Sequence, residues 1–218
     1  YLKTKKEITL CGLRDWLPFM EYNKEWPTGL IVDHTRAYEQ INGLPLRFVK
    51  TANWDECITR SEERKIDIAV PVLEKQNRHG HLIPTKTFEK DHLVLITRVD
   101  TPYISDIELA GPLSASVQKG SSSFDHFVRS RYDNISIVYV ENMQEGLDNV
   151  IEGKTDLYID ALMPTSFYIS RYFPNRLKIN SRVPDIELNG AFGVRNDEPI
   201  LASILNKAID ALESEKKR

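Results

Sequence analysis

The sequence predicts an α/β fold of two lobes, each a mainly parallel sheet flanked by helices. Short apolar segments alternate with amphipathic ones along nearly the whole chain, the pattern of parallel strands joined by crossover helices. One segment, Ile66–Val70, is almost continuously apolar, as expected of a strand covered on both faces. The alternation of strands and helices restarts after a polar, irregular stretch at residues 74–90, so the chain contains two such α/β units.

The first half of the chain alternates strand-length apolar segments with helix-length amphipathic ones. Apolar residues in short runs predict strands, and apolar residues three or four positions apart predict helices. The predicted strands cover residues 8–12, 44–49, 66–70 and 92–97. Helices are predicted between them, at residues 30–42 and 54–64.

The second half repeats this order and then adds one more unit. Its predicted strands cover residues 113–117, 135–140 and 156–159, with helices at 122–131 and 143–151. The last third adds a strand at 190–194 and a helix at 199–212, in which apolar residues recur every four positions from Ile200 to Leu212. No Gly/Ser linker separates the halves.

A second crossing back to the first lobe accounts for the extra unit at the end of the chain. We therefore expect residues 1–94 and 188–218 to form lobe 1, and residues 95–187 to form lobe 2. Two lobes joined by paired crossovers form a hinge, and clefts at domain interfaces are favoured ligand sites.

Composition excludes several classes of partner. The formal charge is −3, from 29 basic and 32 acidic residues, so no strongly basic face is expected for nucleic acid. No run approaches the roughly 18 apolar residues of a membrane span, and the start of the chain lacks the apolar stretch of a signal peptide. The chain begins with Tyr1 and ends in a helical pattern at Arg218, so we expect a fragment of a longer protein.

The cysteines and histidines predict no metal or cofactor. Cys11 and Cys57 lie 46 residues apart and match no metal-ligand spacing. Two buried free thiols are expected, and a disulfide is the alternative, which requires Cα atoms within about 7 Å. His79 and His81 could reach a metal from an extended segment, but no third ligand is evident, so exposed loop histidines are expected.

A series of short motifs resembles the type 3 extracellular solute-binding proteins. The motifs are Leu17–Phe19, Thr28–Asp33, Asn53–Asp55, Ile107–Gly111, Val117–Ser121, Glu152–Asp156 and Ser166–Ile169. They follow the order and spacing of that family and cover nearly the whole chain. The resemblance implies a two-lobed, periplasmic-binding-protein type II (Venus-flytrap) fold that closes on a small solute, such as an amino acid or an organic acid.

The two ends of the chain resemble the sensory branch of this family, found in transmembrane histidine kinases and diguanylate cyclases. The lead-in Tyr1–Leu10 resembles the segment between tandem sensory lobes, and Ile204–Ile209 resembles the terminal helix before a membrane span. The resemblance implies a periplasmic domain tethered to the inner membrane, with a dimer allowed through the parent chain. The alternative is the receptor of an ABC uptake transporter.

A second alternative is a dehydratase-like enzyme on the same fold. Glu74 and Asp160 could serve as acid and base. The sequence contains no nucleophile elbow, phosphate loop, HExxH or CxxC motif, so no enzyme is expected.

The resemblance also assigns candidate ligand-binding residues. Arg78 stands at the position that pairs with a ligand carboxylate, for which a planar guanidinium is suited. Trp16 and Trp54 stand at aromatic positions of the cleft, with core packing as the alternative. Gly120 and Ser121 precede a predicted helix, where N–H groups hold an anion or where an ordinary N-cap forms.

Three positions depart from the family pattern. Lys75 replaces a Thr, and Leu73 replaces a small or hydroxyl residue. Ala161 replaces the carboxylate that takes an amino-acid ammonium, with Asp160 one place earlier. Neighbouring residues of a strand point to opposite faces, so Asp160 substitutes only if the strand has ended there. An ordinary α-amino acid is disfavoured, whereas an organic acid, another small anion or a degenerate site stays open.

Overall fold

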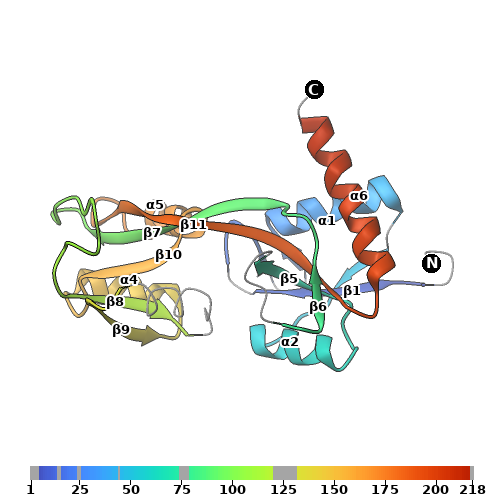
Figure 1. The fold of residues 1–218 in the computed structure, drawn as a ribbon, viewed down its shortest axis with the longest axis horizontal. Coiled ribbons are helices and arrows are strands. Elements are labelled where there is room, and N and C mark those ends of the chain that lie inside the picture. The colour runs from blue at the N-terminus through green and yellow to red at the C-terminus, as the bar shows by residue number, and fades with distance from the viewer. Residues whose placement is uncertain are drawn as a thin grey trace. The chain divides into compact units, whose positions relative to one another are not determined.

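The computed structural model describes residues 5–13, 16–23, 26–43, 45–73, 79–119 and 132–216 (Figure 1). The chain divides into two compact units, which are described separately below. Unit 1 comprises Tyr1–Lys90 and Asn189–Arg218, and unit 2 comprises Asp91–Leu188. Within the described residues, no helix is both long enough and apolar enough to cross a membrane.

Unit 1 is built on a mixed sheet with the strand order β4-β1-β5-β11. The strands are β1 (Ile8–Gly12), β4 (Leu46–Phe48), β5 (Ile68–Leu73) and β11 (Leu177–Arg195). β1 pairs in parallel with both β4 and β5, whereas β11 is antiparallel to β5. The short strand β6 (Leu82–Pro84) pairs with the end of β11, and β2 (Glu21–Asn23) with β3 (Trp26–Thr28) forms a separate hairpin.

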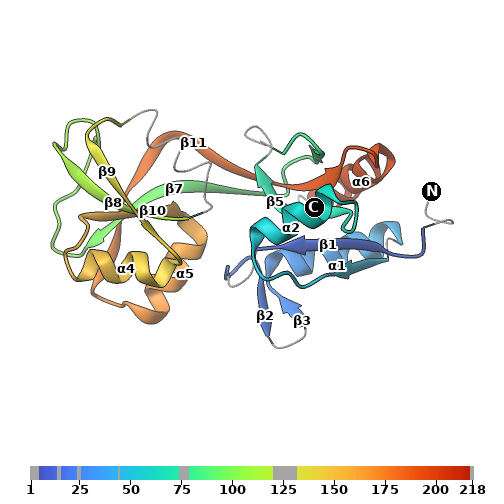
Figure 2. The same ribbon diagram turned by 90° about the horizontal axis from the view of Figure 1, so that it is seen from below.

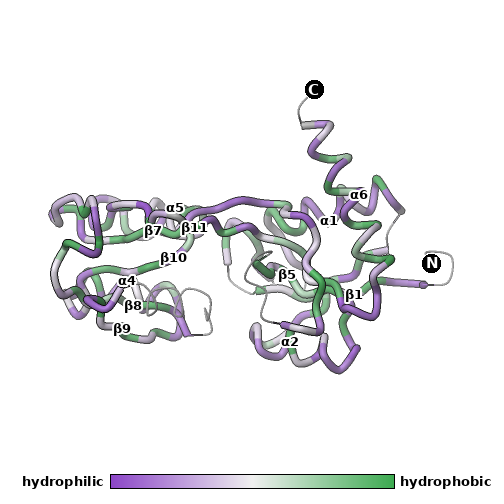
Figure 3. Tube along the Cα trace, viewed as in Figure 1, coloured by the Kyte–Doolittle hydropathy of each residue, from purple (hydrophilic) through white to green (hydrophobic). Residues whose placement is uncertain are grey.

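The helices of unit 1 are α1 (Leu30–Asn42), α2 (Trp54–Glu62) and α6 (Pro199–Lys216). Hydrophobic and hydrophilic residues alternate along α1 and α6, which pack against each other (Figure 3). Gly29 precedes α1 with φ 117°, and a Cβ there would lie 2.6 Å from the Phe19 carbonyl oxygen. Only glycine fits this position. Asn53 starts α2 because its side chain accepts a hydrogen bond from the Glu56 N–H, at 2.9 Å.

Unit 2 has the strand order β11-β7-β10-β8-β9, because the first part of β11 belongs to this unit. The strands are β7 (Glu89–Arg98), β8 (Leu113–Gln118), β9 (Ile135–Val140) and β10 (Leu157–Ala161). β8 pairs in parallel with β9 and β10, and β7 is antiparallel to β10. The helices α4 (Met143–Ile151) and α5 (Leu162–Tyr172) lie on the same side of this sheet (Figure 2).

One cluster of apolar side chains forms the core of unit 2 between the sheet and these helices. Its fully buried members include Ile96, Leu147, Val150 and Tyr158. The Tyr158 ring lies directly under α4, so that a Cβ on Gly146 would come within 2.5 Å of it. Gly146 therefore allows α4 to pack close to the sheet.

The chain passes between the units twice, once in β7 and once in β11. β7 starts in unit 1 with Glu89 and Lys90 and continues in unit 2 from Asp91. β11 starts in unit 2 and enters unit 1 at Asn189. The assignment of residues 1–94 with 188–218, and of 95–187, to two ligand-binding lobes stays a prediction.

The α/β fold class predicted from the sequence is confirmed. The predicted strands at 8–12, 113–117 and 135–140 correspond closely to β1, β8 and β9. The predicted strand at 190–194 is much shorter than β11, and α5, β6 and the β2–β3 hairpin were not predicted. The predicted helix at 122–131 lies outside the described residues.

Candidate functional site

Three of the predicted ligand-binding residues lie at one edge of the unit 1 sheet. β1, β4 and β5 run in parallel, so their carboxyl ends meet at the same edge. Trp16 follows the end of β1, Trp54 follows β4 as the first residue of α2, and Leu73 is the last residue of β5. All three side chains are half-buried. We call this set, with Thr51 of the β4–α2 loop, the unit 1 edge.

Trp16 lies in a tight turn that fixes its ring. Its ring stacks on Phe19, with centroids 4.3 Å apart and an interplanar angle of 25°. The turn is closed by hydrogen bonds from the Phe19 N–H to the Trp16 carbonyl and from the Trp16 N–H to the Met20 carbonyl, both 2.8 Å. The same turn meets α1, because the N–H groups of Leu30 and Ile31 donate to the carbonyls of Pro18 and Phe19 at 3.0 Å.

Trp54 has contacts on the core side and on the loop side. It packs against an apolar cluster that includes Cys57 and Val72, as a core residue does. Its ring also lies edge-on to His79, with centroids 6.3 Å apart. The indole therefore joins the core of unit 1 to the segment that follows the undescribed residues 74–78.

His79 and His81 are half-buried, which corrects the expectation of exposed loop histidines. Their rings are 6.1 Å apart, and the His81 Nε2 lies 2.8 Å from the Ser61 hydroxyl. Burial lowers the pKa of His79, and neighbouring His81 lowers it further. The chain packs these rings against α2, a contact that sequence spacing alone does not indicate. Among described residues, no group of three or more His, Cys, Asp or Glu side chains could hold a metal ion.

Thr51 was missed by the sequence analysis and belongs to the unit 1 edge. It lies between β4 and α2 and is only 2% exposed. No described group forms a hydrogen bond with its buried hydroxyl. An unsatisfied buried hydroxyl costs roughly 1–3 kcal/mol, so a water molecule or a ligand atom is the expected partner. Its place between a strand end and the N-cap Asn53 was the available sequence signal.

Several predicted residues lie outside the described parts of the chain. They are Glu74, Lys75, Arg78, Gly120 and Ser121.

Asp160 lies inside unit 2 and is engaged by neighbouring groups. The Tyr158 hydroxyl donates to one carboxylate oxygen at 2.5 Å, and the Ala161 N–H donates to the other at 2.7 Å. β10 continues through Ala161, so the strand has not ended at Asp160. The condition under which Asp160 would take the place of the family's carboxylate is not met. Burial raises the pKa of Asp160 to about 6, although both hydrogen bonds lower it.

Asp91, the first residue of unit 2, holds the start of α5. One carboxylate oxygen accepts a hydrogen bond from the Met163 N–H at 3.0 Å, and the other accepts from the His92 N–H at 2.7 Å. The N-cap residue Ala161 has no side-chain acceptor of its own. Asp91 therefore caps α5 from a neighbouring strand, and its burial raises its pKa.

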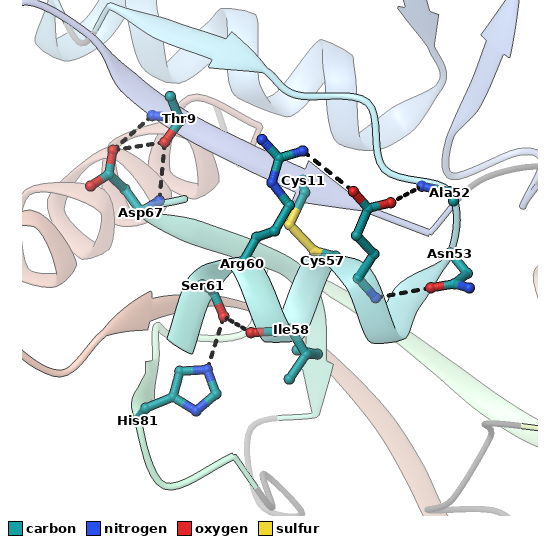
Figure 4. Close-up of a disulfide and its surroundings, with 11 residues drawn as sticks. Thr9, Cys11, Ala52, Asn53, Cys57, Ile58, Arg60, Ser61, Asp67 and His81 are labelled. Atoms are coloured by element: carbon teal, nitrogen blue, oxygen red, sulfur yellow. Dashed lines mark hydrogen bonds and ion pairs between the residues drawn. A yellow bond between two sulfur atoms is a disulfide. The ribbon is translucent and has the colours of Figure 1, made fainter. Parts of the chain in front are cut away.

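A disulfide joins Cys11 of β1 to Cys57 of α2 (Figure 4). This corrects the expectation of two free thiols and agrees with the alternative. Both cysteines are fully buried, and their Cα atoms are 5.7 Å apart. Cys57 lies on the buried face of α2, directly over β1. The spacing of the two cysteines in the sequence could not predict how close they lie in the fold. Structural disulfides are typical of oxidising compartments.

Comparison with known proteins identifies what the chain is similar to. Residues 8–218 match the family model of bacterial extracellular solute-binding proteins, family 3. The match covers nearly the whole chain and confirms the resemblance inferred from the motifs.

Among curated proteins, the chain is similar to the virulence sensor protein BvgS of Bordetella bronchiseptica. The two are 23% identical over 175 residues, which make up 79% of this chain and 14% of BvgS. The chain thus spans about a seventh of this relative's length.

Two solved structures share the fold. A crystal structure of the Bordetella pertussis BvgS VFT2 domain, a double mutant, superposes with a TM-score of 0.86 at 20% identity, covering 99% of this chain and 91% of that one. A histidine kinase sensor domain with similarity to periplasmic binding proteins gives a TM-score of 0.85 at 17% identity, covering 99% and 93%. At these sequence identities, the two comparisons show a shared fold and no more.

Proposed function

The chain belongs to the bacterial extracellular solute-binding proteins, family 3, and from this membership we propose that it is the ligand-binding sensor domain of a longer transmembrane signalling protein. The family binds solutes, so the chain is a binding domain and not an enzyme. One observation carries the proposal: 79% of the chain aligns with a sensor protein of which it spans only 14%. A histidine kinase output and a periplasmic, membrane-tethered location are part of the proposal.

The unit 1 edge is the proposed ligand-binding surface. The indole of Trp16, stacked on Phe19, and the half-buried Trp54 offer flat apolar walls. The Thr51 hydroxyl offers a polar group that has no described partner. Arg78, which follows this edge in the sequence, is proposed to pair with a ligand anion.

The proposed ligand is a small organic acid or another anionic, amino-acid-like solute. An ordinary α-amino acid also needs a carboxylate for its ammonium group. Ala161 supplies none, and both oxygens of Asp160 already accept hydrogen bonds within unit 2. We propose that binding favours a closed arrangement of the two units, which requires higher affinity for that state.

A thermal-shift screen tests this function. Small carboxylic acids, amino acids and polyamines are added to the chain, and the melting temperature Tm is measured. A ligand at about 100 times its Kd adds about 2.7 kcal/mol to stability, which corresponds to a rise in Tm of roughly 5–10 °C. The rise should be lost in Arg78→Ala and reduced in Thr51→Val, which keeps the side-chain shape but removes the hydroxyl.

Two outcomes would contradict the proposal. No rise in Tm with any compound would argue against a ligand-sensing domain. A rise that persists unchanged in both variants would place the ligand away from the unit 1 edge.

A further inference from the structure

The segment Thr85–Phe88 connects β6 to β7 and is held against β11 at both ends. Thr85 is buried, and its N–H donates to the Phe192 carbonyl at 2.9 Å. The Phe192 N–H donates in return to the Thr85 hydroxyl at 3.0 Å. At the other end, the Phe88 N–H donates to the Gly190 carbonyl at 2.9 Å. We call these four residues the strap.

The strap lies next to both points where the chain leaves and re-enters unit 1. Phe88 is two residues before Lys90, after which the chain crosses into unit 2, and Gly190 is two residues after Leu188, after which the chain returns to unit 1. The hydrogen bond from Phe88 to Gly190 therefore joins the two crossing strands just inside unit 1. This bond and the strap behind it therefore lie beside the backbone segments that cross between the units.

On its other side the strap binds α6 through Lys86. The Lys86 N–H donates to the Asn206 side-chain oxygen at 2.7 Å. The Lys86 ammonium donates to both carboxylate oxygens of Asp210, each at 2.6 Å. Asn206 and Asp210 are four residues apart and so share one face of α6. Lys86 thus contacts two successive turns of the helix.

Other contacts also hold α6 on unit 1. Leu201, Leu205 and Ala208 are fully buried on its apolar face. The Asn42 side-chain amide donates to the Ile204 carbonyl at 3.0 Å. Because the Lys86 and Asp210 side chains are about half exposed, at 54% and 53%, their ion pair adds little to stability. Its geometry nevertheless links the strap to α6.

We propose that Lys86 is a positioning residue that couples the conformation of the two crossing strands to the orientation of α6. This inference rests on the proposed sensor function, in which a change at the crossings has to reach another part of the protein. Coupling between two sites is reciprocal in free energy, so disturbing the contact on α6 must also alter the crossing strands.

Amide hydrogen exchange of the ligand-free chain tests the coupling. Asp210→Asn removes the charge from α6, and Lys86→Met removes it from the strap. Each variant should speed exchange of the Phe88 and Phe192 amides about fivefold, because their hydrogen bonds join the strap to β11. The charge-reversed pair Lys86→Glu with Asp210→Lys should restore slow exchange.

Glu7→Gln is the matched control. It disrupts the ion pair of Glu7 with Arg47, whose side chains are 50% and 55% exposed, close to the exposure of the Lys86–Asp210 pair. The control should leave the Phe88 and Phe192 amides unchanged. Faster exchange confined to Lys86 and α6 in Asp210→Asn would mean that the contact is only a surface ion pair, and would overturn the inference.

The failure of this inference is separable from failure of the proposed function. If a compound raises Tm but Asp210→Asn leaves the exchange rates of the Phe88 and Phe192 amides unchanged, the proposed coupling is wrong and the sensor function stands. If those amides respond but no compound raises Tm, the coupling stands as a property of the fold and the ligand-sensing function is wrong.

Discussion

The Tyr158 hydroxyl donates a 2.5 Å hydrogen bond to the Asp160 carboxylate, two residues further along β10 on the same face of the strand. Both side chains are buried, and burial raises the pKa of each, that of Tyr158 well above its ordinary value. The nearby Asp91 adds to the rise at Asp160. Unit 2 therefore contains a carboxyl group that binds its proton more tightly in the folded state than in the unfolded state.

This carboxyl group should make stability depend on pH. Its pKa rises from 3.8 to about 6 on folding, so its contribution to the free energy of unfolding is complete below about pH 4 and is lost as the pH rises through 6. The loss amounts to about 3 kcal/mol. Between pH 4.5 and pH 7.5, urea unfolding should show about 2 kcal/mol of this loss in the wild type relative to Asp160→Asn, which cannot ionise, because the unfolded carboxyl group is already mostly ionised at pH 4.5.

The pKa of Asp67 shifts in the opposite direction to that of Asp160. Burial would raise its pKa, but hydrogen bonds from Thr9 and Lys5 outweigh that effect and lower it. Its contribution to stability is therefore present above its ordinary pKa and is lost at lower pH, opposite in sign to that of Asp160. If the free energy of unfolding of Asp160→Asn differs from that of the wild type by the same amount at pH 4.5 and at pH 7.5, the pH dependence does not come from Asp160.

Loss of the Cys11–Cys57 disulfide should lower stability substantially. The two cysteines are separated by 46 residues, and closing a loop of that size stabilises the folded state by about 4 kcal/mol in the chain-entropy account. The double variant Cys11→Ala, Cys57→Ala should lose about this much in urea unfolding at neutral pH. A reducing agent should reproduce the loss in the wild type and have no effect on the variant. Two free thiols in the oxidised protein by mass spectrometry would disprove the bond.

Replacing Gly146 by alanine should destabilise unit 2 even though alanine favours helices. The added Cβ would lie 2.5 Å from the Tyr158 ring, whose position is set by its hydrogen bond to Asp160. The expected loss is about 1–3 kcal/mol in urea unfolding. Gly43→Ala is a useful comparison, because it strains a left-handed helix end at φ 64° but meets no atom within 4 Å. It should cost about 1 kcal/mol. Gly146→Ala at wild-type stability would mean that α4 moves away from the sheet freely.

The sequence predicted the elements whose local pattern is uniform. β8 and β9 are short apolar runs, and their bounds were predicted to within about one residue. Most of β11 was missed because polar residues and Pro184 interrupt the apolar pattern from which a strand is inferred. α5 was missed because Pro164, within its first turn, weakens the helical signal.

The candidate site could be predicted only in part, because its remaining features depend on distances. Trp16 and Trp54 follow strand ends in the sequence, so their place at one sheet edge could be inferred. The contact of Cys57 with Cys11 depends on how α2 packs over β1. The lack of a partner for the Thr51 hydroxyl among the described residues depends on how the surrounding elements pack. Neither is encoded in a local pattern.

The turn that carries Trp16 also supplies the acceptors for the first free N–H groups of α1. Gly29 allows this by letting the Phe19 carbonyl approach where any Cβ would collide. A movement of the Pro18 and Phe19 carbonyls would therefore leave two N–H groups at the start of this thirteen-residue helix without their acceptors. In the proposed binding site, the Trp16 indole is thus positioned by its stacking on Phe19 before a solute binds, so little of its conformational entropy is left to lose on binding.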